Sequence, residues 1–174
     1  MRSVPQSPAA HLIDVRPLTI HGPYMSESNI ERFDQLTGLV FSRLYQSFPI
    51  AIDLNVMQFA DALVYDEPIS AENLRRGGEP YDFFDNTIRW LIESGYVVSR
   101  HPSSYPYTFE TCTLTAKALE VLKAVPQSVG GESLGGQIAA AAQEGATAKL
   151  KELAGEVLSK GYGLAVNAAM NWSS

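Results

Sequence analysis

The stretch "FFDNTIRWLIESGYVV", residues 83–98, says most about the fold. Apolar residues in and just before it recur at spacings of three and four, the pattern of an amphipathic helix: Tyr81, Phe84, Ile88 and Leu91. Gly95 stands where the residue after a helix adopts a left-handed conformation, and the β-branched pair behind it favours a strand. We therefore predict a helix over 81–94 that leads directly into a strand.

The residues that follow predict a β-hairpin and another helix. "YVVSR" and "YTFETCTL" read as strands, and the turn-rich "HPSSYP" separates them. Thr115 is placed to cap "AKALEVLKAV", which Pro126 ends. Three apolar residues of this helix are expected on one face: Leu119, Leu122 and Val125.

The residues before the opening stretch predict two helices and a short strand. "SESNIERFDQLTGLVFSRLYQSFP" keeps a helical period, Ser28 and Glu31 are spaced as a capping box, and Pro49 stops the helix. "IAIDL" suits a half-buried strand with Ile50, Ile52 and Leu54 on one side. Asn55 can cap a second helix, "VMQFADALVY", and a loop over about 66–80 follows it.

The order helix, short strand, helix, helix, hairpin, helix, with the phrases "TIRWLIESGYVV" and "LTAKALEVL", resembles the winged helix-turn-helix superfamily over about residues 29–126. The resemblance implies that helix 81–94 is a recognition helix, that the hairpin is a wing, and that DNA is the usual partner. The long loop before the helix departs from the family's turn of three or four residues.

Two further segments flank this domain. Residues 1–28 hold four of the ten prolines and predict an irregular arm that is loose or docks on another surface. Residues 127–174 are rich in Ala and Gly and predict helices, with "GGESLGG" as a linker and "GYGLA" as a helix breaker. These helices could pair between two copies or pack back on the domain, and the sequence leaves both open. The fold class is α+β, mainly helical.

Charge argues against the role that the resemblance implies. Thirteen Lys and Arg residues stand against nineteen Asp and Glu residues, which gives a net charge of −6. Nonspecific DNA affinity depends on Lys and Arg that neutralise phosphates. Helix 81–94 carries three acidic residues that we predict to bind a basic protein partner: Asp82, Asp85 and Glu93. The alternative is a nucleic-acid interface made of Arg75, Arg76, Arg89, Arg100, His101, Tyr105 and Tyr107.

Neither catalysis nor cofactor binding is predicted. The three histidines, at positions 11, 21 and 101, have no metal-ligand spacing, and no phosphate-binding loop is recognisable. Cys112 is the only cysteine, and we expect a buried apolar residue that shares a strand side with Glu110 and Leu114. The chain has no secretory signal pattern and no apolar run of about eighteen residues, so we expect a cytoplasmic protein without a membrane span.

The sequence thus predicts a non-enzymatic binding module of winged-helix type that acts through protein contacts, as a homo-oligomer held by its C-terminal helices. A DNA-binding regulator that uses the wing and Arg89 is the alternative. A third hypothesis is a small acidic inhibitor or immunity-type protein that masks a basic, nucleic-acid-processing partner.

Overall fold

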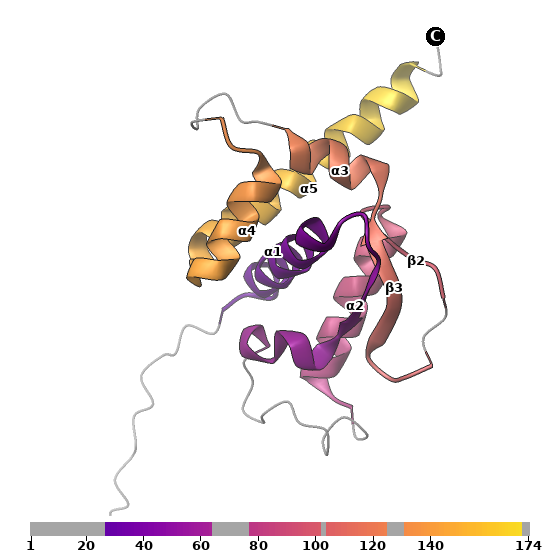
Figure 1. Cartoon of the computed structure of the whole chain (residues 1–174), viewed down its shortest axis with the longest axis vertical. Helices are drawn as coiled ribbons and strands as arrows, with labels where there is room; N and C mark the ends of the chain where they lie inside the picture. Colours follow the sequence, from indigo (N-terminus) through magenta and orange to yellow (C-terminus); the bar gives the residue numbers. More distant parts are fainter. Residues whose placement is uncertain (1–26, 64–76, 102–103, 125–130, 172–174) are drawn as a thin grey trace, which may run out of the picture.

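The computed structural model describes residues 27–63, 77–101, 104–124 and 131–171, and it shows a mainly helical α+β fold with one small antiparallel sheet (Figure 1). This confirms the predicted fold class. The N-terminal arm, apart from its last two residues, lies outside the described residues. The elements are α1 (Asn29–Ser47), β1 (Ile52–Asn55), the 3₁₀ helix η1 (Val56–Ala62), α2 (Glu79–Glu93), β2 (Val97–Ser99), β3 (Thr108–Leu114), α3 (Ala116–Lys123), α4 (Leu134–Glu144) and α5 (Thr147–Asn171).

Helix ends follow the predicted caps. The Ser28 hydroxyl accepts a hydrogen bond from the Glu31 N–H at 3.3 Å, and the Glu31 carboxylate accepts one from the Ser28 N–H at 2.8 Å, which completes a capping box. Gly95 follows α2 with a φ of 73°, a conformation that glycine adopts without a steric penalty. Thr115 caps α3 by accepting a hydrogen bond from the Ala118 N–H at 3.2 Å.

The sheet has the strand order β1-β3-β2, and both pairs are antiparallel. A bulge interrupts the β1–β3 pair, because the two-residue step from Ile52 to Leu54 on β1 is matched by a three-residue step on β3, from Cys112 to Phe109. At the bulge Thr111 has a φ of 50°, and its N–H donates a hydrogen bond to the Asp53 carboxylate at 2.8 Å. As a result Phe109 and Cys112 are both buried, and the predicted alternation that put Cys112 beside Glu110 is wrong.

Two predicted elements before α2 differ in detail. The strand begins at Ile52, and Ile50 is 70% exposed instead of half-buried, since the turn after α1 extends to residue 50. The segment after Asn55 is a 3₁₀ helix, although Asn55 caps it as predicted by accepting a hydrogen bond from the Met57 N–H at 2.9 Å. The helical turn expected after Ser70 lies outside the described residues.

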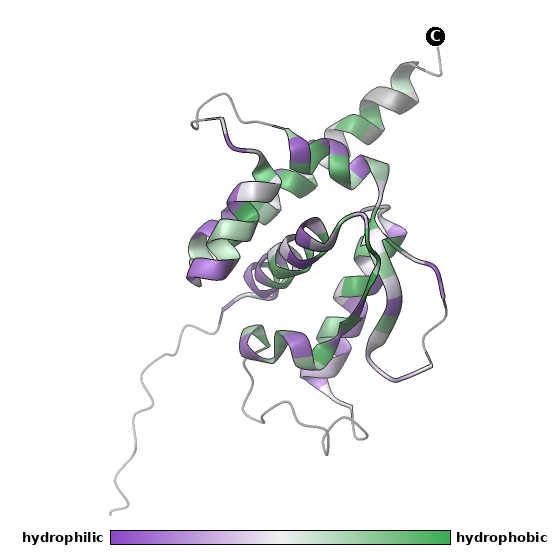
Figure 2. Ribbon diagram, viewed as in Figure 1, coloured by the Kyte–Doolittle hydropathy of each residue, from purple (hydrophilic) through white to green (hydrophobic). Residues whose placement is uncertain are grey.

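Helix α1 is the centre of the molecule. It contacts α2, η1 and the sheet on one side and α4 and α5 on the other (Figure 1). Its fully buried side chains are Leu36, Thr37, Val40, Phe41 and Leu44, each at most 1% exposed. Figure 2 shows apolar and hydrophilic residues alternating along the helices, as expected when one face of a helix lies in a core.

The C-terminal helices belong to the same core. Buried residues of α4 and α5 join the cluster that α1 and α2 begin: Leu134, Ile138, Ala141, Leu150, Leu153 and Val157. Of the two uses left open by the sequence, this is packing back on the domain. Leu134 to Gly136 are the first turn of α4, so the predicted linker is shorter than "GGESLGG".

"GYGLA" does not break a helix, because Gly161 and Gly163 both lie inside α5. At Gly161 the reason is a close approach. A Cβ there would overlap the hydroxyl of Tyr96, which donates a hydrogen bond to the Leu158 carbonyl at 2.9 Å. The glycine therefore lets α5 pass over the end of the α2–β2 connection.

We predict that Gly38→Ala destabilises the protein although alanine is the better helix former. A Cβ at position 38 would lie 2.7 Å from Leu150 Cγ and 3.1 Å from the Leu150 carbonyl oxygen. Overpacking of this kind costs about 1–3 kcal/mol, against a gain of about 1 kcal/mol in helix propensity.

The matched control is Gly155→Ala, also in a helix, where a Cβ meets nothing within 4 Å. This variant should gain about 0.5–1 kcal/mol in urea denaturation. Equal effects of the two substitutions would show that α5 does not lie against α1 at Gly38.

Candidate functional site

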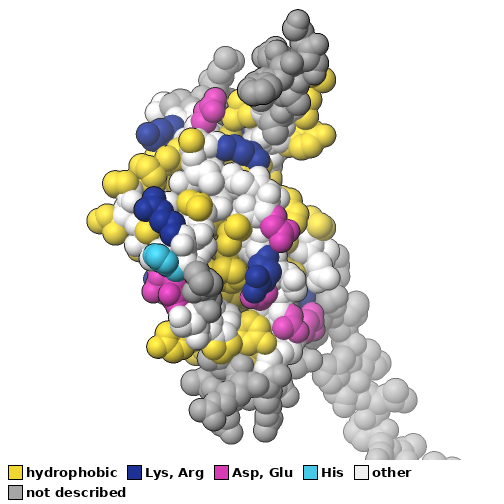
Figure 3. All heavy atoms as spheres, turned by 90° about the vertical axis from the view of Figure 1, so that its right-hand side faces the viewer, with side chains coloured by type: hydrophobic (Ala, Val, Ile, Leu, Met, Phe, Trp, Pro, Cys, Tyr) yellow, Lys and Arg dark blue, Asp and Glu magenta, His cyan; other side chains and the backbone are white. Residues whose placement is uncertain are grey.

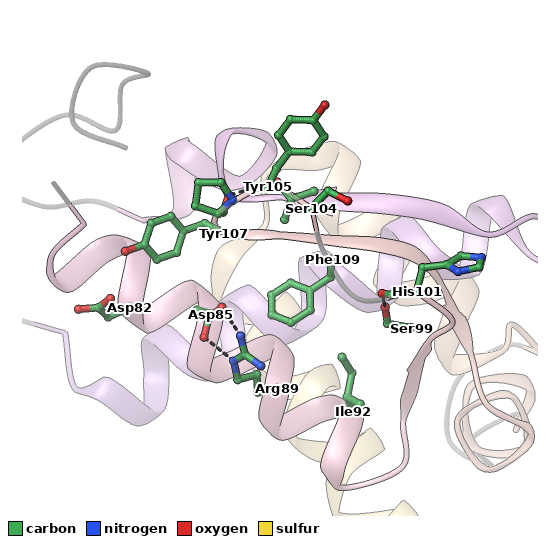
Figure 4. Close-up of a pocket in the computed structure, with 12 residues that line it drawn as sticks. Asp82, Asp85, Arg89, Ile92, Ser99, His101, Ser104, Tyr105, Tyr107 and Phe109 are labelled. Atoms are coloured by element: carbon green, nitrogen blue, oxygen red, sulfur yellow. Dashed lines mark hydrogen bonds and ion pairs between the residues drawn. The ribbon is translucent and has the colours of Figure 1, made fainter. Parts of the chain in front are cut away.

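An open groove of about 670 Å³ lies between α2 and the β2–β3 hairpin (Figure 4). We call it the α2–hairpin groove. Helix α2 contributes Asp82, Asp85, Arg89 and Ile92. The hairpin contributes Ser99, His101, Ser104, Tyr105, Pro106, Tyr107, Thr108 and Phe109. The groove therefore brings together residues that the sequence assigned to two competing hypotheses, the acidic protein-binding set and the nucleic-acid set.

Local structure explains why these side chains meet. Spacings of three and four put Asp82, Asp85 and Arg89 on one face of α2. On the hairpin, Tyr107 has a φ of 50°, and its carbonyl accepts a hydrogen bond from the Val56 N–H at 3.1 Å. This left-handed residue turns the chain into β3 and lays the Tyr107 ring against the ring of Tyr81, with 5.2 Å between centroids.

Arg89 is the only basic residue of α2, and it is engaged within the groove. Its Nε donates to Asp85 Oδ2 at 2.6 Å and its Nη2 donates to Oδ1 at 3.2 Å, which makes a bidentate pair. The guanidinium carbon lies 5.4 Å from the Phe109 ring centroid (Figure 4). Hydrogen bonding to Asp85 and the charge of that carboxylate raise the pKa of Arg89, and Glu93 adds to the effect.

Burial and the negative charge of the groove both raise the pKa of the Tyr107 phenol. Burial is the largest cause, and the charges of Asp82 and Asp85 and a hydrogen bond with Asp82 raise this pKa further. Figure 4 shows the hydroxyl directed toward Asp82. Gly77 makes room for this hydroxyl, because a Cβ at residue 77 would lie 2.5 Å from it, and the φ of 67° at Gly77 also favours glycine.

Of the remaining predicted residues that the structure describes, His101 and Tyr105 line the groove from the hairpin and the others do not. Glu93 is exposed on α2 and does not line the groove. Arg100 is exposed on the hairpin and is also outside the lining. Tyr105 is 71% exposed and its ring points away from the groove in Figure 4. Arg75 and Arg76 lie outside the described residues.

Phe109 and Gly77 are residues of the site that sequence reasoning missed. Phe109 reads as an ordinary core residue of a strand, and the bulge that directs it to the edge of the groove has no sequence signal of its own. The Gly77–Gly78 pair marked the end of a loop, but nothing local indicated that a tyrosine thirty residues later would need the space.

The hairpin side of the molecule has no continuous basic surface among the residues drawn in colour. In Figure 3 Lys and Arg side chains stand apart and are interspersed with Asp and Glu. Over residues 79–124, four basic and six acidic side chains give a net charge of −2. The described residues of this side therefore offer few basic side chains for the phosphate neutralisation on which nonspecific DNA binding depends.

A second, apolar hollow lies between α1 and α2. Its lining has no charged residue and consists of Ile30, Phe33, Phe83, Asn86, Thr87 and Trp90. Trp90 is 43% exposed and Ile30 is 69% exposed. Exposed tryptophan next to aliphatic surface is typical of protein interfaces. The exposed parts of α2 are therefore acidic toward the hairpin and apolar toward α1.

The part of the chain that the structure describes contains neither a cluster of metal-ligating side chains nor a membrane-spanning helix. Within residues 27–63, 77–101, 104–124 and 131–171, no three His, Cys, Asp or Glu residues gather as a metal site requires. No helix among these residues is long and apolar enough to cross a membrane.

Comparisons of the chain with protein-family models, with characterised proteins and with solved structures give no match.

Cys112 should be chemically inert in the folded protein. It is fully buried, and burial raises the pKa of its thiol to about 11 from an ordinary value of 9.0. Because only the thiolate is alkylated, that shift alone lowers the reactive fraction at pH 8 about 100-fold. We expect iodoacetamide to label the folded protein at least about 100-fold more slowly than the urea-unfolded protein.

The same shift makes stability depend on pH. Above pH 9 the unfolded thiol ionises while the folded one stays protonated, so stability falls as pH rises toward 11, by up to about 3 kcal/mol. Cys112→Ala should remove this part of the loss. An identical pH profile for wild type and variant would contradict the assigned burial of the thiol.

Substitution at Gly77 should disturb the groove through Tyr107. Gly77→Ala and Gly131→Ala both place a side chain at positive φ, at a cost of about 1 kcal/mol, but only residue 77 also meets the Tyr107 hydroxyl. We therefore expect Gly77→Ala to destabilise the protein more than Gly131→Ala. Adding Tyr107→Phe should recover part of the difference, and a double-mutant cycle without coupling would exclude the contact.

Proposed function

We propose that this protein is a non-enzymatic binding module that holds a basic protein partner in the α2–hairpin groove. The observation that carries the proposal is the bidentate Asp85–Arg89 pair, which engages the only basic residue of α2. Helix α2 then presents three further carboxylates, at Glu79, Asp82 and Glu93. Complementary charge selects partners and speeds their association, so the partner surface is expected to carry Lys or Arg.

The surroundings of the groove favour a protein over a nucleic acid. The groove has aromatic residues within it and at its rim, and the apolar hollow with Trp90 lies on the opposite flank of α2. A partner that covers both flanks would bury apolar area at its centre and charge at its edge, which is the usual anatomy of a protein interface.

The alternative is a DNA-binding regulator, and one observation favours it. The element order from α1 to α3 and the strand order β1-β3-β2 are those expected of a winged helix, whose usual role is DNA binding. In that case exposed residues of the hairpin, Arg100, His101 and Tyr105, would contact DNA. The acidic face of α2 would then lie close to phosphates, which is why we rank this function second.

The proposed homo-oligomer concerns the end of α5. Residues of α4 and α5 up to Val157 are packed on α1, so they do not supply a free pairing surface. Beyond them Tyr162 is 72% exposed and Met170 is 64% exposed. We propose that any pairing of copies uses this end of α5, and that the protein acts in the cytoplasm.

The proposed function predicts a complex that depends on charge in the groove. Immobilised protein is exposed to a nuclease-treated extract, a retained protein is purified, and its affinity is measured by fluorescence anisotropy. Asp82→Lys/Asp85→Lys should weaken binding at least about tenfold, because the two substitutions replace attraction between groove carboxylates and a basic partner by repulsion. The matched control, Glu152→Lys/Glu156→Lys on α5, makes the same change in net charge away from the groove.

Circular dichroism checks that both variants are folded. Equal affinities of the groove variant and the control variant would contradict the proposed function. Retention of a protein from untreated extract that is lost from nuclease-treated extract would favour the DNA-binding alternative instead.

A further inference from the structure

The α2–hairpin groove contains a guanidinium site that the chain itself fills. Its parts are a carboxylate from α2, Asp85, and an aromatic ring from the start of β3, Phe109. Arg89 makes two hydrogen bonds to the first, at 2.6 and 3.2 Å, and its guanidinium carbon lies over the second at 5.4 Å from the ring centroid. A bidentate contact with a carboxylate and a planar contact with a ring are the two interactions in which arginine exceeds lysine.

The same pair of groups occurs again beside this site. Asp82 precedes Asp85 by three residues, about 4.5 Å along the helix, and Tyr107 precedes Phe109 by two residues on the hairpin. Both line the groove, and Figure 4 shows the Tyr107 hydroxyl directed toward Asp82. Within residues 27–63, 77–101, 104–124 and 131–171, no Lys or Arg forms an ion pair with Asp82.

We propose that Asp82 and Tyr107 bind an arginine side chain of the protein partner. This rests on the proposed function and names the group recognised. The incoming guanidinium donates to the Asp82 carboxylate, which has several acceptor positions. The plane of this guanidinium lies on the Tyr107 ring, in the same way as the guanidinium of Arg89 lies over the Phe109 ring.

Three features of the groove favour this occupant. Asp82 is exposed and Tyr107 is half-buried, so one group is accessible and the other is held in place. The Tyr107 ring packs against the ring of Tyr81, with 5.2 Å between centroids, and its hydroxyl lies close to Gly77. The charges of Asp82 and Asp85 that raise the pKa of Tyr107 also attract a cation, even with Arg89 present.

The test is a titration of the full-length, ¹⁵N-labelled protein with three capped tripeptides, acetyl-Gly-Xaa-Gly-amide, in which Xaa is arginine, lysine or norleucine. The arginine peptide should shift the backbone amide signals of Asp82 and Tyr107 in a saturable way. Its affinity should be at least about threefold above that of the lysine peptide, and norleucine should give no shifts at these residues.

Two variants locate the site. Asp82→Asn should weaken binding of the arginine peptide at least about fivefold, because it removes the charge but keeps the shape. Glu93→Gln makes the same change in charge on the same helix outside the groove and should change affinity less than about twofold. Equal losses in both variants would overturn the proposal, because they would show only a general attraction to the acidic helix.

Four other results would overturn the arginine site or the proposed function. Equal affinity for arginine and lysine overturns the assignment of a guanidinium. Peptide binding that appears only after Arg75→Gln/Arg76→Gln overturns it as well, because the chain would then fill the site itself. A partner complex that forms but is unaffected by Asp82→Asn refutes the arginine site alone, whereas the absence of any charge-dependent complex refutes the proposed function.

Discussion

The structure depends on the burial of α1 from both sides. One side packs against α2 and the sheet, and the other side packs against α4 and α5, so the helix is surrounded by the chain that follows it. Helices α1 and α5 approach closely where α1 has a glycine, as at Gly38 beneath Leu150. Because α1 uses its surface in this way, the outer side of α2 and the hairpin stay exposed.

The ion pair within the groove determines which charges that outer side exposes. An isolated arginine on α2 would be available to a phosphate or a base edge, but Arg89 is bound to Asp85 and covers Phe109. A partly exposed pair of this kind adds little to stability, about 0.3–0.5 kcal/mol for a helical i,i+4 pair. Its consequence is that Asp82 and Glu93 are the exposed carboxylates that flank it.

Elements with strong local patterns could be predicted from the sequence. Helix α2, Gly95 after it and the capping box at Ser28 all depend on neighbours within a few residues, so the sequence contains the whole cause. Helix α4 was cut short by the prediction because glycine is a poor helix former. In the fold Gly135 lies against the ring of Tyr45, and no window of local sequence contains that contact.

The groove was only half predictable for the same reason. Asp82, Asp85 and Tyr107 could be selected by residue type, but the sequence assigned the first two to one partner class and the third to another. These three residues meet in one groove because the bulge at Thr111 and the left-handed conformation of Tyr107 direct the hairpin toward α2. Such positive φ values at residues other than glycine carry strain and are not signalled by propensity.

The central claim is that the acidic α2–hairpin groove faces a protein and not a nucleic acid. The most direct measurement is a fluorescence anisotropy titration of labelled protein with mixed genomic duplex DNA at about 50 mM and about 200 mM salt. Our account predicts no binding even at the lower salt concentration, since the described residues of this face form no continuous basic surface. Tight binding that weakens by several orders of magnitude between the two salt concentrations would contradict it, because that dependence marks the release of counterions from phosphates.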